Sequence, residues 1–298
     1  MMFKSGFVAM IGKPNVGKST LLNLLIGEKI AIVSPKPQAT RKSVRGILNG
    51  KDYQIIFIDT PGVHESEKKL NQVMKKYIDE ALEDFDLAVV ITDNHGEIDE
   101  VLAEYLSKIK EKSKKAILIV NKTDLMNKEQ IEQIKSEFTS KANFEKIIET
   151  SLIGSPDAKE KILEAILELL PEGPKYYEDD IISTETERFI IAEIIREKVM
   201  NNVSKEIPYH IAVTVEEMKY RQEKELYYIK ANIIVERRAH KMIIIGEGGK
   251  KIKEIGKQAR QEIEAFLRTK VYLELWVKIK EHWTKKEALI KEYIDPRF

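Results

Sequence analysis

A glycine-rich segment near the N-terminus has the spacing of a phosphate-binding loop. Residues 12–19 have the sequence Gly-Lys-Pro-Asn-Val-Gly-Lys-Ser, which fits the pattern G-x-x-x-x-G-K-[S/T]. Glycines let such a loop curl until several backbone N–H groups point at one anion, and the lysine adds a positive charge for the β- and γ-phosphates of a nucleotide. The predicted phosphate-binding residues are Gly12, Asn15, Val16, Gly17, Lys18, Ser19 and Thr20.

Three later positions could complete a site for Mg²⁺ and a γ-phosphate. Asp59 opens the tetrapeptide Asp-Thr-Pro-Gly after an apolar run. Its carboxylate could hold Mg²⁺ through a water, while the N–H of Gly62 contacts the γ-phosphate. Thr40 is the best candidate for a switch threonine that closes on both. We expect Ser19, Thr40 and Asp59 to form the magnesium site; the alternatives are a strand-ending turn and a solvated loop threonine.

The tetrapeptide Asn-Lys-Thr-Asp that ends at Asp124 could select guanine over adenine. Its carboxylate can accept hydrogen bonds from N1–H and the 2-amino group of guanine, and because adenine offers neither donor the discrimination could reach about 10⁴. Asn121 would hold neighbouring loops, and the stem of Lys122 would lie over the ring. The backbone N–H groups of Ser151 and Leu152 could contact guanine O6. Polar turns without a ligand are the alternative for both segments.

Short apolar runs alternate with amphipathic segments over the first part of the chain. The runs span 7–11, 55–58, 87–91 and 116–120. Runs that are apolar throughout are typical of strands buried on both faces, and their alternation with helical patterns predicts a doubly wound, mostly parallel α/β sheet. Pro-Glu-Gly-Pro would end the last helix, so we predict domains at 1–174 and 184–298, joined by a linker at 175–183.

The pattern changes in the C-terminal part of the chain. Thr184 and Glu187 have the spacing of a capping box before an amphipathic helix. Two alternating strands follow, the first beginning at Tyr209, then a short helix, a glycine turn, a long helix from Lys250, a third alternating strand and a final helix at 283–293. The order α-β-β-α-α-β predicts an α+β domain with one half-exposed sheet.

The glycine turn, Gly-Glu-Gly-Gly at 246–249, lies between two predicted helices. Residues without a Cβ let phosphates touch the main chain, and the next helix presents its N-terminus to the anion. From residue 236 to residue 261 eight cationic and three acidic side chains give a local charge of +5, against +1 for the whole chain. This pattern favours binding of single-stranded RNA; the alternative is a helix cap and a solvated basic helix. The predicted RNA-binding residues are Arg237, Arg238, Lys241, Gly246, Glu247, Gly248, Gly249, Lys250, Lys251 and Lys253.

Composition excludes several other classes. The 298 residues include no cysteine, which rules out disulfides, Cys-ligated zinc and thiol catalysis, and the five histidines lack metal-ligand spacing. No apolar stretch reaches the ~18 residues of a membrane span. The first apolar run leads straight into the phosphate loop, which disfavours a signal peptide. We therefore expect a cytoplasmic protein.

Taken in order, these motifs resemble those of the translation-factor-related GTPases. Gly-x-Pro-Asn-Val-Gly-Lys-Ser and Asp-Thr-Pro-Gly are similar to the motifs of the Era, Der and TrmE group. The Gly-x-x-Gly turn resembles the loop of a KH domain in the type II element order. One GTPase domain followed by one KH domain makes the chain similar to Era-type GTPases over essentially its full length. Der-type proteins have two GTPase domains, and TrmE-type proteins use a C-terminal cysteine.

The Era resemblance implies a molecular switch that hydrolyses GTP to GDP, uses Mg²⁺, and serves in assembly of the small ribosomal subunit. It implies binding to the 3′ end of small-subunit ribosomal RNA in the GTP-loaded state. We expect a monomer with ribosomal RNA and the small subunit as partners, and not DNA. Peripheral association with the inner face of the cell membrane is implied by the resemblance alone.

Three positions bear on catalysis and leave alternatives open. Val63 stands where Ras-type enzymes have a catalytic glutamine, so we expect another catalytic device and slow unassisted hydrolysis. Leu152 stands where the last guanine-binding motif usually has an alanine after the serine. This difference weakens only the assignment of that motif, because the predicted contact is through the backbone. Asn15 stands where TrmE-like enzymes place a K⁺ ligand, and it either holds K⁺ or only hydrogen-bonds the loop. The alternative function is an RNA-binding protein that holds guanine nucleotide as a structural ligand with negligible turnover, whereas Asp124 argues against a P-loop kinase.

Overall fold

The computed structural model describes residues 2–36, 38–62, 69–203 and 206–295, so Val63 lies outside the described residues. Residue contacts divide the chain into two units. The first unit comprises 1–31, 40–67 and 74–184, and the second comprises 32–39, 68–73 and 185–298. The segment 32–39 therefore belongs by its contacts to the C-terminal unit, although the chain on both sides of it belongs to the first.

Six strands form the sheet of the first unit: β1 Lys4–Ile11, β2 Val44–Gly50, β3 Tyr53–Asp59, β4 Leu87–Thr92, β5 Lys115–Val120 and β6 Lys146–Glu149. Their order is β2-β3-β1-β4-β5-β6, and all pairings are parallel except that of β2 with β3. The predicted mostly parallel sheet is confirmed. The edge strand β2 was not predicted, because its sequence, Val-Arg-Gly-Ile-Leu-Asn-Gly, is neither apolar throughout nor regularly alternating.

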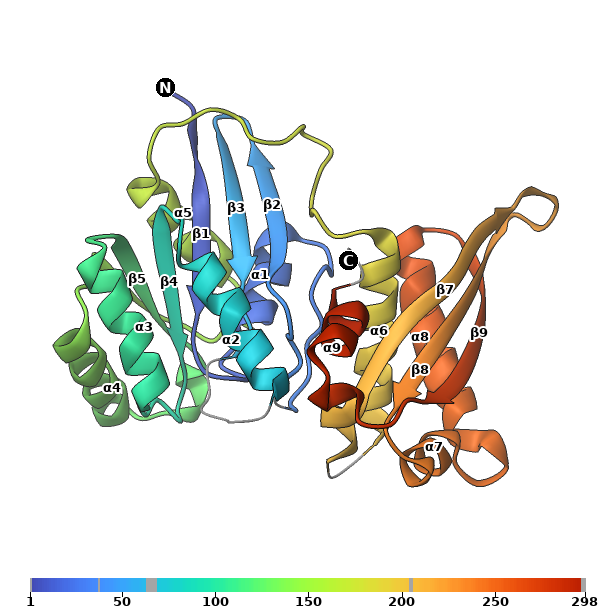
Figure 1. The fold of residues 1–298 in the computed structure, drawn as a ribbon. Helices are drawn as coiled ribbons and strands as arrows, with labels where there is room; N and C mark the ends of the chain where they lie inside the picture. The colour runs from blue at the N-terminus through green and yellow to red at the C-terminus, as the bar shows by residue number, and fades with distance from the viewer. Residues whose placement is uncertain (1, 37, 63–68, 204–205, 296–298) are drawn as a thin grey trace. The chain divides into compact units, whose positions relative to one another are not determined.

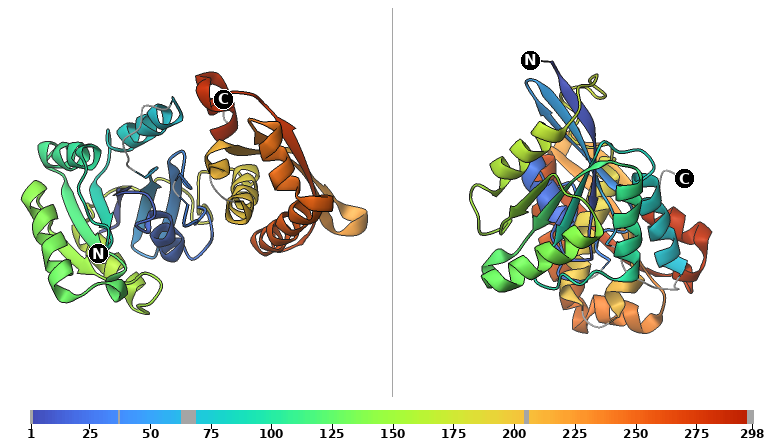
Figure 2. Two further views of the ribbon diagram at one scale, coloured as in Figure 1. Left: turned by 90° about the horizontal axis from the view of Figure 1, so that it is seen from below. Right: turned by 90° about the vertical axis from the view of Figure 1, so that its left-hand side faces the viewer.

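Helices cover both faces of this sheet: α1 Lys18–Ile26, α2 Lys69–Ala81, α3 Glu100–Glu111, α4 Lys128–Lys141 and α5 Ala158–Leu169. Figures 1 and 2 show the strands between α2 and α3 on one side and α1 on the other. All six residues of β4 are buried, as expected for a strand packed on both faces. Because β1, β3, β4, β5 and β6 are parallel, the loops that follow them meet at one edge of the sheet, where ligands bind in such folds.

The segment predicted as a linker, 175–183, makes specific contacts with the first unit. Oε1 of Gln54 accepts hydrogen bonds from the N–H groups of Tyr176 and Tyr177, at 2.7 and 3.0 Å. The N–H of Ile47 donates to the carbonyl of Ile182 at 2.8 Å. This segment therefore runs along β2 and β3 and is bound to them.

The second unit contains α6 Glu187–Asn202, β7 Ile211–Arg221, β8 Leu226–Val235, α7 Arg238–Ile245, α8 Lys250–Leu267, β9 Lys270–Ile279 and α9 Glu287–Ile294. The strand order is β7-β8-β9, with β7 antiparallel and β9 parallel to β8. The predicted order α-β-β-α-α-β is confirmed, and α6 and α8 pack against each other and the sheet.

Two local predictions in this unit were wrong. α6 is capped by Thr186, whose Oγ1 accepts from the N–H of Phe189 at 3.2 Å, and not by Thr184. Two threonines precede this helix, and the capping-box spacing fits the first although the helix begins after the second. Tyr209 lies in a 3₁₀ turn before β7, which begins at Ile211. Within the described ranges, none of the helices is long and apolar enough to cross a membrane.

Candidate GTP and RNA sites

The predicted phosphate loop lies between β1 and α1, and tight packing requires its glycines. Gly17 has φ +112°, and a Cβ there would lie 2.5 Å from Nδ2 of Asn121. A Cβ on Gly12 would lie 2.2 Å from the carbonyl oxygen of Ile91. The first turn of α1 contains no acidic residue, so its free N–H groups and positive dipole end suit a phosphate group.

Lys18 is only 5% exposed and curls back over the loop. Its Nζ donates to the carbonyl oxygens of Gly12 and Lys13 at 2.9 and 2.8 Å. Burial lowers the pKa of the Lys18 ammonium to about 8, although Asp59 and Asp93 act against this shift. A phosphate beside it would stabilise the charged form, as expected of a lysine that binds β- and γ-phosphates.

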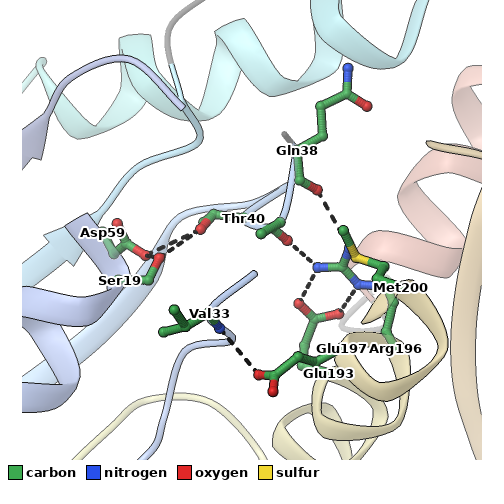
Figure 3. Close-up of polar contacts among 10 residues, drawn as sticks. Ser19, Val33, Gln38, Thr40, Asp59, Glu193, Arg196, Glu197 and Met200 are labelled. Atoms are coloured by element: carbon green, nitrogen blue, oxygen red, sulfur yellow. Dashed lines mark hydrogen bonds and ion pairs between the residues drawn. The ribbon is translucent and has the colours of Figure 1, made fainter. Parts of the chain in front are cut away.

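The three predicted magnesium ligands lie together, as Figure 3 shows. Oγ of Ser19 donates to Oδ2 of Asp59 at 2.6 Å and lies 2.9 Å from Oγ1 of Thr40. Oγ1 of Thr40 lies 3.3 Å from the same carboxylate oxygen. Burial raises the pKa of Asp59, whereas Lys18 and the two hydroxyls lower it.

This group fits Mg²⁺ in its donor chemistry. Hydroxyl and carboxylate oxygens are the ligands that a hard divalent cation prefers. Oδ1 of Asp59 is buried and has no hydrogen-bond partner among the residues that the structure describes. A buried carboxylate oxygen without a hydrogen-bond partner destabilises the fold unless a ligand or a water binds it. The sequence predicts such a partner, since it predicts that Asp59 holds Mg²⁺ through a water.

Asn121 connects two loops, as the sequence predicted. Its Nδ2 donates to the carbonyl of Val16 at 2.8 Å, and its Oδ1 accepts from the N–H of Leu152 at 3.0 Å. The phosphate loop and the segment after β6 are thereby held together. The N–H of Ser151 donates to Oγ of Ser155 at 3.3 Å. Both N–H groups predicted for guanine O6 thus have protein acceptors here, and their contact with the base stays a prediction.

Lys122 has φ +60° and extends toward the phosphate loop. Its Nζ lies 2.9 Å from the carbonyl oxygen of Asn15 and 2.5 Å from Oδ2 of Asp93. Asp93 was not among the predicted site residues. Its place directly after a buried parallel strand could have indicated that it lies at the nucleotide site. Asp124 is exposed in a short 3₁₀ helix, where its carboxylate is accessible to a base.

Gly62 approaches the phosphate loop closely. A Cβ at this position would lie 2.7 Å from Cα of Pro14. The backbone after β3 therefore passes beside the loop, where its N–H could sense a γ-phosphate. A side chain at Gly62 would force the two segments apart.

The glycine turn of the second unit combines left-handed backbone angles with an open surface. Gly248 and Gly249 have φ +56° and +75°, and among the described residues no heavy atom lies within 4 Å of a Cβ built on either. The positive φ and the open surface explain these glycines, since packing does not. At Gly246 a Cβ would lie 2.7 Å from Cβ of Lys251. α8 begins directly after the turn, with no acidic residue in its first turn.

A groove of about 740 Å³ lies between α8 and β9. It is lined by Lys250, Ile252, Lys253, Glu254, Gly256, Lys257, Arg260, Tyr272, Leu273 and Leu275. Cationic and apolar side chains in one groove suit single-stranded nucleic acid, whose phosphates need charge and whose bases need apolar or aromatic surface. Of the predicted RNA-binding residues, Lys250 and Lys253 line it. Arg237 and Arg238 are exposed near the start of α7, and Lys241 lies further along that helix.

The apolar side of the groove was not predicted. Tyr272, Leu273 and Leu275 come from β9, and the sequence analysis assigned its alternating residues only to the sheet. A half-exposed alternating strand does not reveal which of its side chains border a groove, because that depends on how α8 crosses it.

Known proteins that are similar to this chain contain the same two kinds of domain. A family model described as a 50S ribosome-binding GTPase matches residues 7–122, and one described as a KH domain matches residues 206–284. The chain is 48% identical over 295 residues to GTPase Era of Caldicellulosiruptor saccharolyticus, covering 98% of this chain and 97% of the relative. The chain belongs to the Era family of GTPases. It is 45% identical to GTPase Era of Halothermothrix orenii, covering 98% of each chain.

Two crystal structures of Era are similar over the same length. One is Era in complex with MgGDPNP and nucleotides 1506–1542 of 16S ribosomal RNA, with a TM-score of 0.91, 38% identity and 98% of each chain covered. The other is Aquifex aeolicus Era bound to GDP and AlF₄⁻, with a TM-score of 0.91, 38% identity, and 98% of this chain and 99% of that chain covered. The predicted GTPase and KH domains are confirmed, and the chain is an enzyme that hydrolyses GTP. Membership in this family excludes the two alternative functions, a P-loop kinase and an RNA-binding protein that holds guanine nucleotide only as a structural ligand.

Proposed function

We propose that this GTPase, when loaded with GTP, binds the 3′ end of small-subunit ribosomal RNA during assembly of the small ribosomal subunit. The groove between α8 and β9 is the observation that carries the proposal. It places cationic and apolar side chains beside a glycine turn of positive φ. A family member of the same architecture holds 16S ribosomal RNA together with MgGDPNP.

The glycine turn and the groove would bind different parts of the RNA. Phosphates would approach the main chain at Gly248 and Gly249, where no side chain hinders them, and the N-terminus of α8 adds favourable dipole charge. Lys253, Lys257 and Arg260 would neutralise phosphates along the strand, and bases would lie on the apolar part of the groove.

The nucleotide site would act as the switch. Ser19, Thr40 and Asp59 would hold Mg²⁺, which when bound neutralises charge on the β- and γ-phosphates. Lys18 binds the same phosphates, and Asp124 reads the base. The hydroxyl of Thr40 and the N–H of Gly62 would contact the γ-phosphate, so its loss would release the segments that carry them.

Three further predictions belong to this proposal. K⁺ bound beside Asn15 would replace the missing glutamine by placing positive charge near the β,γ-bridging oxygen. The protein would act as a monomer in the cytoplasm, where the small ribosomal subunit is assembled. The peripheral membrane association that the resemblance implies stays a prediction.

Crosslinking tests the choice of RNA. The protein with GDPNP would be irradiated with complete small-subunit ribosomal RNA, and the bound nucleotides and peptides mapped. We expect crosslinks to concentrate at the RNA 3′ end and at peptides that carry Lys253 and Tyr272. Crosslinks spread evenly along the RNA, or concentrated elsewhere on it, would contradict the proposal.

A further inference from the structure

The segment that leads into the switch threonine is bound to α6. The N–H of Val33 donates to Oε2 of Glu197 at 3.1 Å, and Oγ of Ser34 donates to Oδ1 of Asn201 at 3.1 Å. Nζ of Lys36 donates to the carbonyl oxygens at the end of α6, those of Met200 and Val203. These contacts place 32–39 in the C-terminal unit.

Arg196 of α6 holds the last residues of this segment, as Figure 3 shows. It is 2% exposed, and its Nε and Nη2 donate to the two carboxylate oxygens of Glu193 at 2.7 and 2.6 Å. Nη1 donates to the carbonyl of Gln38 at 3.5 Å, and Nη2 donates to the carbonyl of Ala39. Glu193 compensates the buried charge, and the remaining donors of the guanidinium bind the backbone just before Thr40.

Thr40 transmits this anchoring to the nucleotide site. It is joined to Ala39 by a peptide bond, and its hydroxyl lies beside Ser19 and Asp59 in the first unit. Gln38 has φ +62°, a conformation that a glutamine adopts only when its surroundings hold it. The backbone of Gln38 and Ala39 is therefore held by Arg196, and the hydroxyl of the next residue lies beside the predicted magnesium ligands.

We propose that Arg196 is a positioning residue for GTP hydrolysis, acting through the carbonyls of Gln38 and Ala39 to place the hydroxyl of Thr40. Its hydrogen-bond partners among the described residues, Glu193, Gln38, Ala39 and Met200, include none of the residues predicted to bind the nucleotide. The inference rests on the proposed function in one respect, that Thr40 closes on the metal and the γ-phosphate. Arg196 thereby sets the position of the backbone directly before Thr40, and at a catalytic group a misplacement of about 1 Å can cost about 10²-fold in rate.

Replacement by lysine tests the role of the guanidinium fork. Arg196→Lys keeps a positive charge for Glu193 but cannot donate from a planar fork to two carbonyls as well. We expect kcat for GTP hydrolysis to fall about tenfold or more. The affinity for GDP, which does not need Thr40, should stay within about twofold. Arg188→Lys, at an exposed position of the same helix, is the matched control and should leave both values unchanged.

A double variant distinguishes positioning from a general structural effect. If Arg196 acts through Thr40, Arg196→Lys combined with Thr40→Ala should be no slower than Thr40→Ala alone. Additive losses would overturn the proposal, and so would an equal loss of GDP affinity in Arg196→Lys. If Thr40→Ala itself hydrolyses GTP at the normal rate, the assumed role of Thr40 fails, which is a failure of the proposed function and of the inference built on it.

A second variant covers the case in which Arg196→Lys does not fold. Glu193→Gln keeps the size of the partner but removes the charge that orients the guanidinium. We expect kcat to fall several-fold with GDP affinity unchanged. A normal kcat in Glu193→Gln would overturn the proposal, because the guanidinium would then position Thr40 without the charge that orients it.

Discussion

The hydroxyl of Ser19 and the carboxylate of Asp59 are 2.6 Å apart, although 40 residues separate them in the chain. Ser19 lies in the first turn of α1, the helix after β1, and Asp59 ends β3, which pairs with β1 in parallel. The register of these two strands therefore brings the two side chains together. Their hydrogen bond leaves the other carboxylate oxygen for a metal-bound water, and this arrangement makes the magnesium site testable.

Asp59→Asn should weaken the binding of GDPNP in Mg²⁺ by about tenfold or more, because a neutral amide compensates the cation poorly. Without Mg²⁺, the variant and the original protein should bind GDPNP equally well. Titration of Mg²⁺ with a fluorescent GDPNP analogue measures both. Asp52→Asn, an exposed aspartate near the start of β3, is the control. A normal Mg²⁺ dependence in Asp59→Asn would place the metal elsewhere.

Asp124→Asn should weaken GTP binding by at least about 10²-fold, because the amide cannot accept both donors of guanine. It should improve binding of xanthosine triphosphate, whose 2-carbonyl suits an amide donor. Calorimetry with both nucleotides measures the exchange, and Asp84→Asn, exposed in the same unit, is the control. Unchanged GTP affinity would show that another group reads the base.

Gly248→Asp should abolish RNA binding and leave GTP affinity intact. The aspartate adds a negative charge where phosphates should approach. Gly248→Asn is the matched variant, since asparagine has the same size and also tolerates positive φ. We expect it to retain far more RNA affinity than Gly248→Asp in a filter-binding assay. RNA affinity within a few-fold of normal in Gly248→Asp would mean that the phosphates lie elsewhere.

GTP turnover should be several-fold faster in K⁺ than in Na⁺ at equal ionic strength, because K⁺ fits a cage of carbonyl, amide and phosphate oxygens that is too wide for Na⁺. Asn15→Ala should remove the difference and leave GDP affinity nearly unchanged. Phosphate release at saturating GTP and Mg²⁺ measures the rates. Equal rates in the two salts would leave Asn15 with the loop-stabilising role alone.

The parts that sequence predicted well are those whose chemistry is local. The phosphate loop and the tetrapeptide ending at Asp124 each follow a buried strand, and Asp59 ends one, so parallel pairing was enough to bring them to one edge. The glycine turn could also be predicted from the sequence, since positive φ at Gly248 and Gly249 is a property of the turn itself.

The parts that sequence did not predict depend on contacts between distant segments. Arg196 lies in a helix for which the sequence predicts only an amphipathic pattern, and nothing local shows that its side chain binds Ala39. Asp93 has no motif around it, and its role depends on Lys122 reaching it across the sheet edge. Tyr272 and Leu275 were assigned to a strand, and only the crossing of α8 makes them part of a groove.

RNA affinity in the two nucleotide states tests the central claim most directly. A labelled oligonucleotide of the 3′ end of small-subunit ribosomal RNA would be titrated by fluorescence anisotropy with protein saturated in GDPNP or in GDP. The account predicts at least about tenfold tighter binding with GDPNP, corresponding to about 1.4 kcal/mol of coupling. Equal affinity in the two states would contradict it.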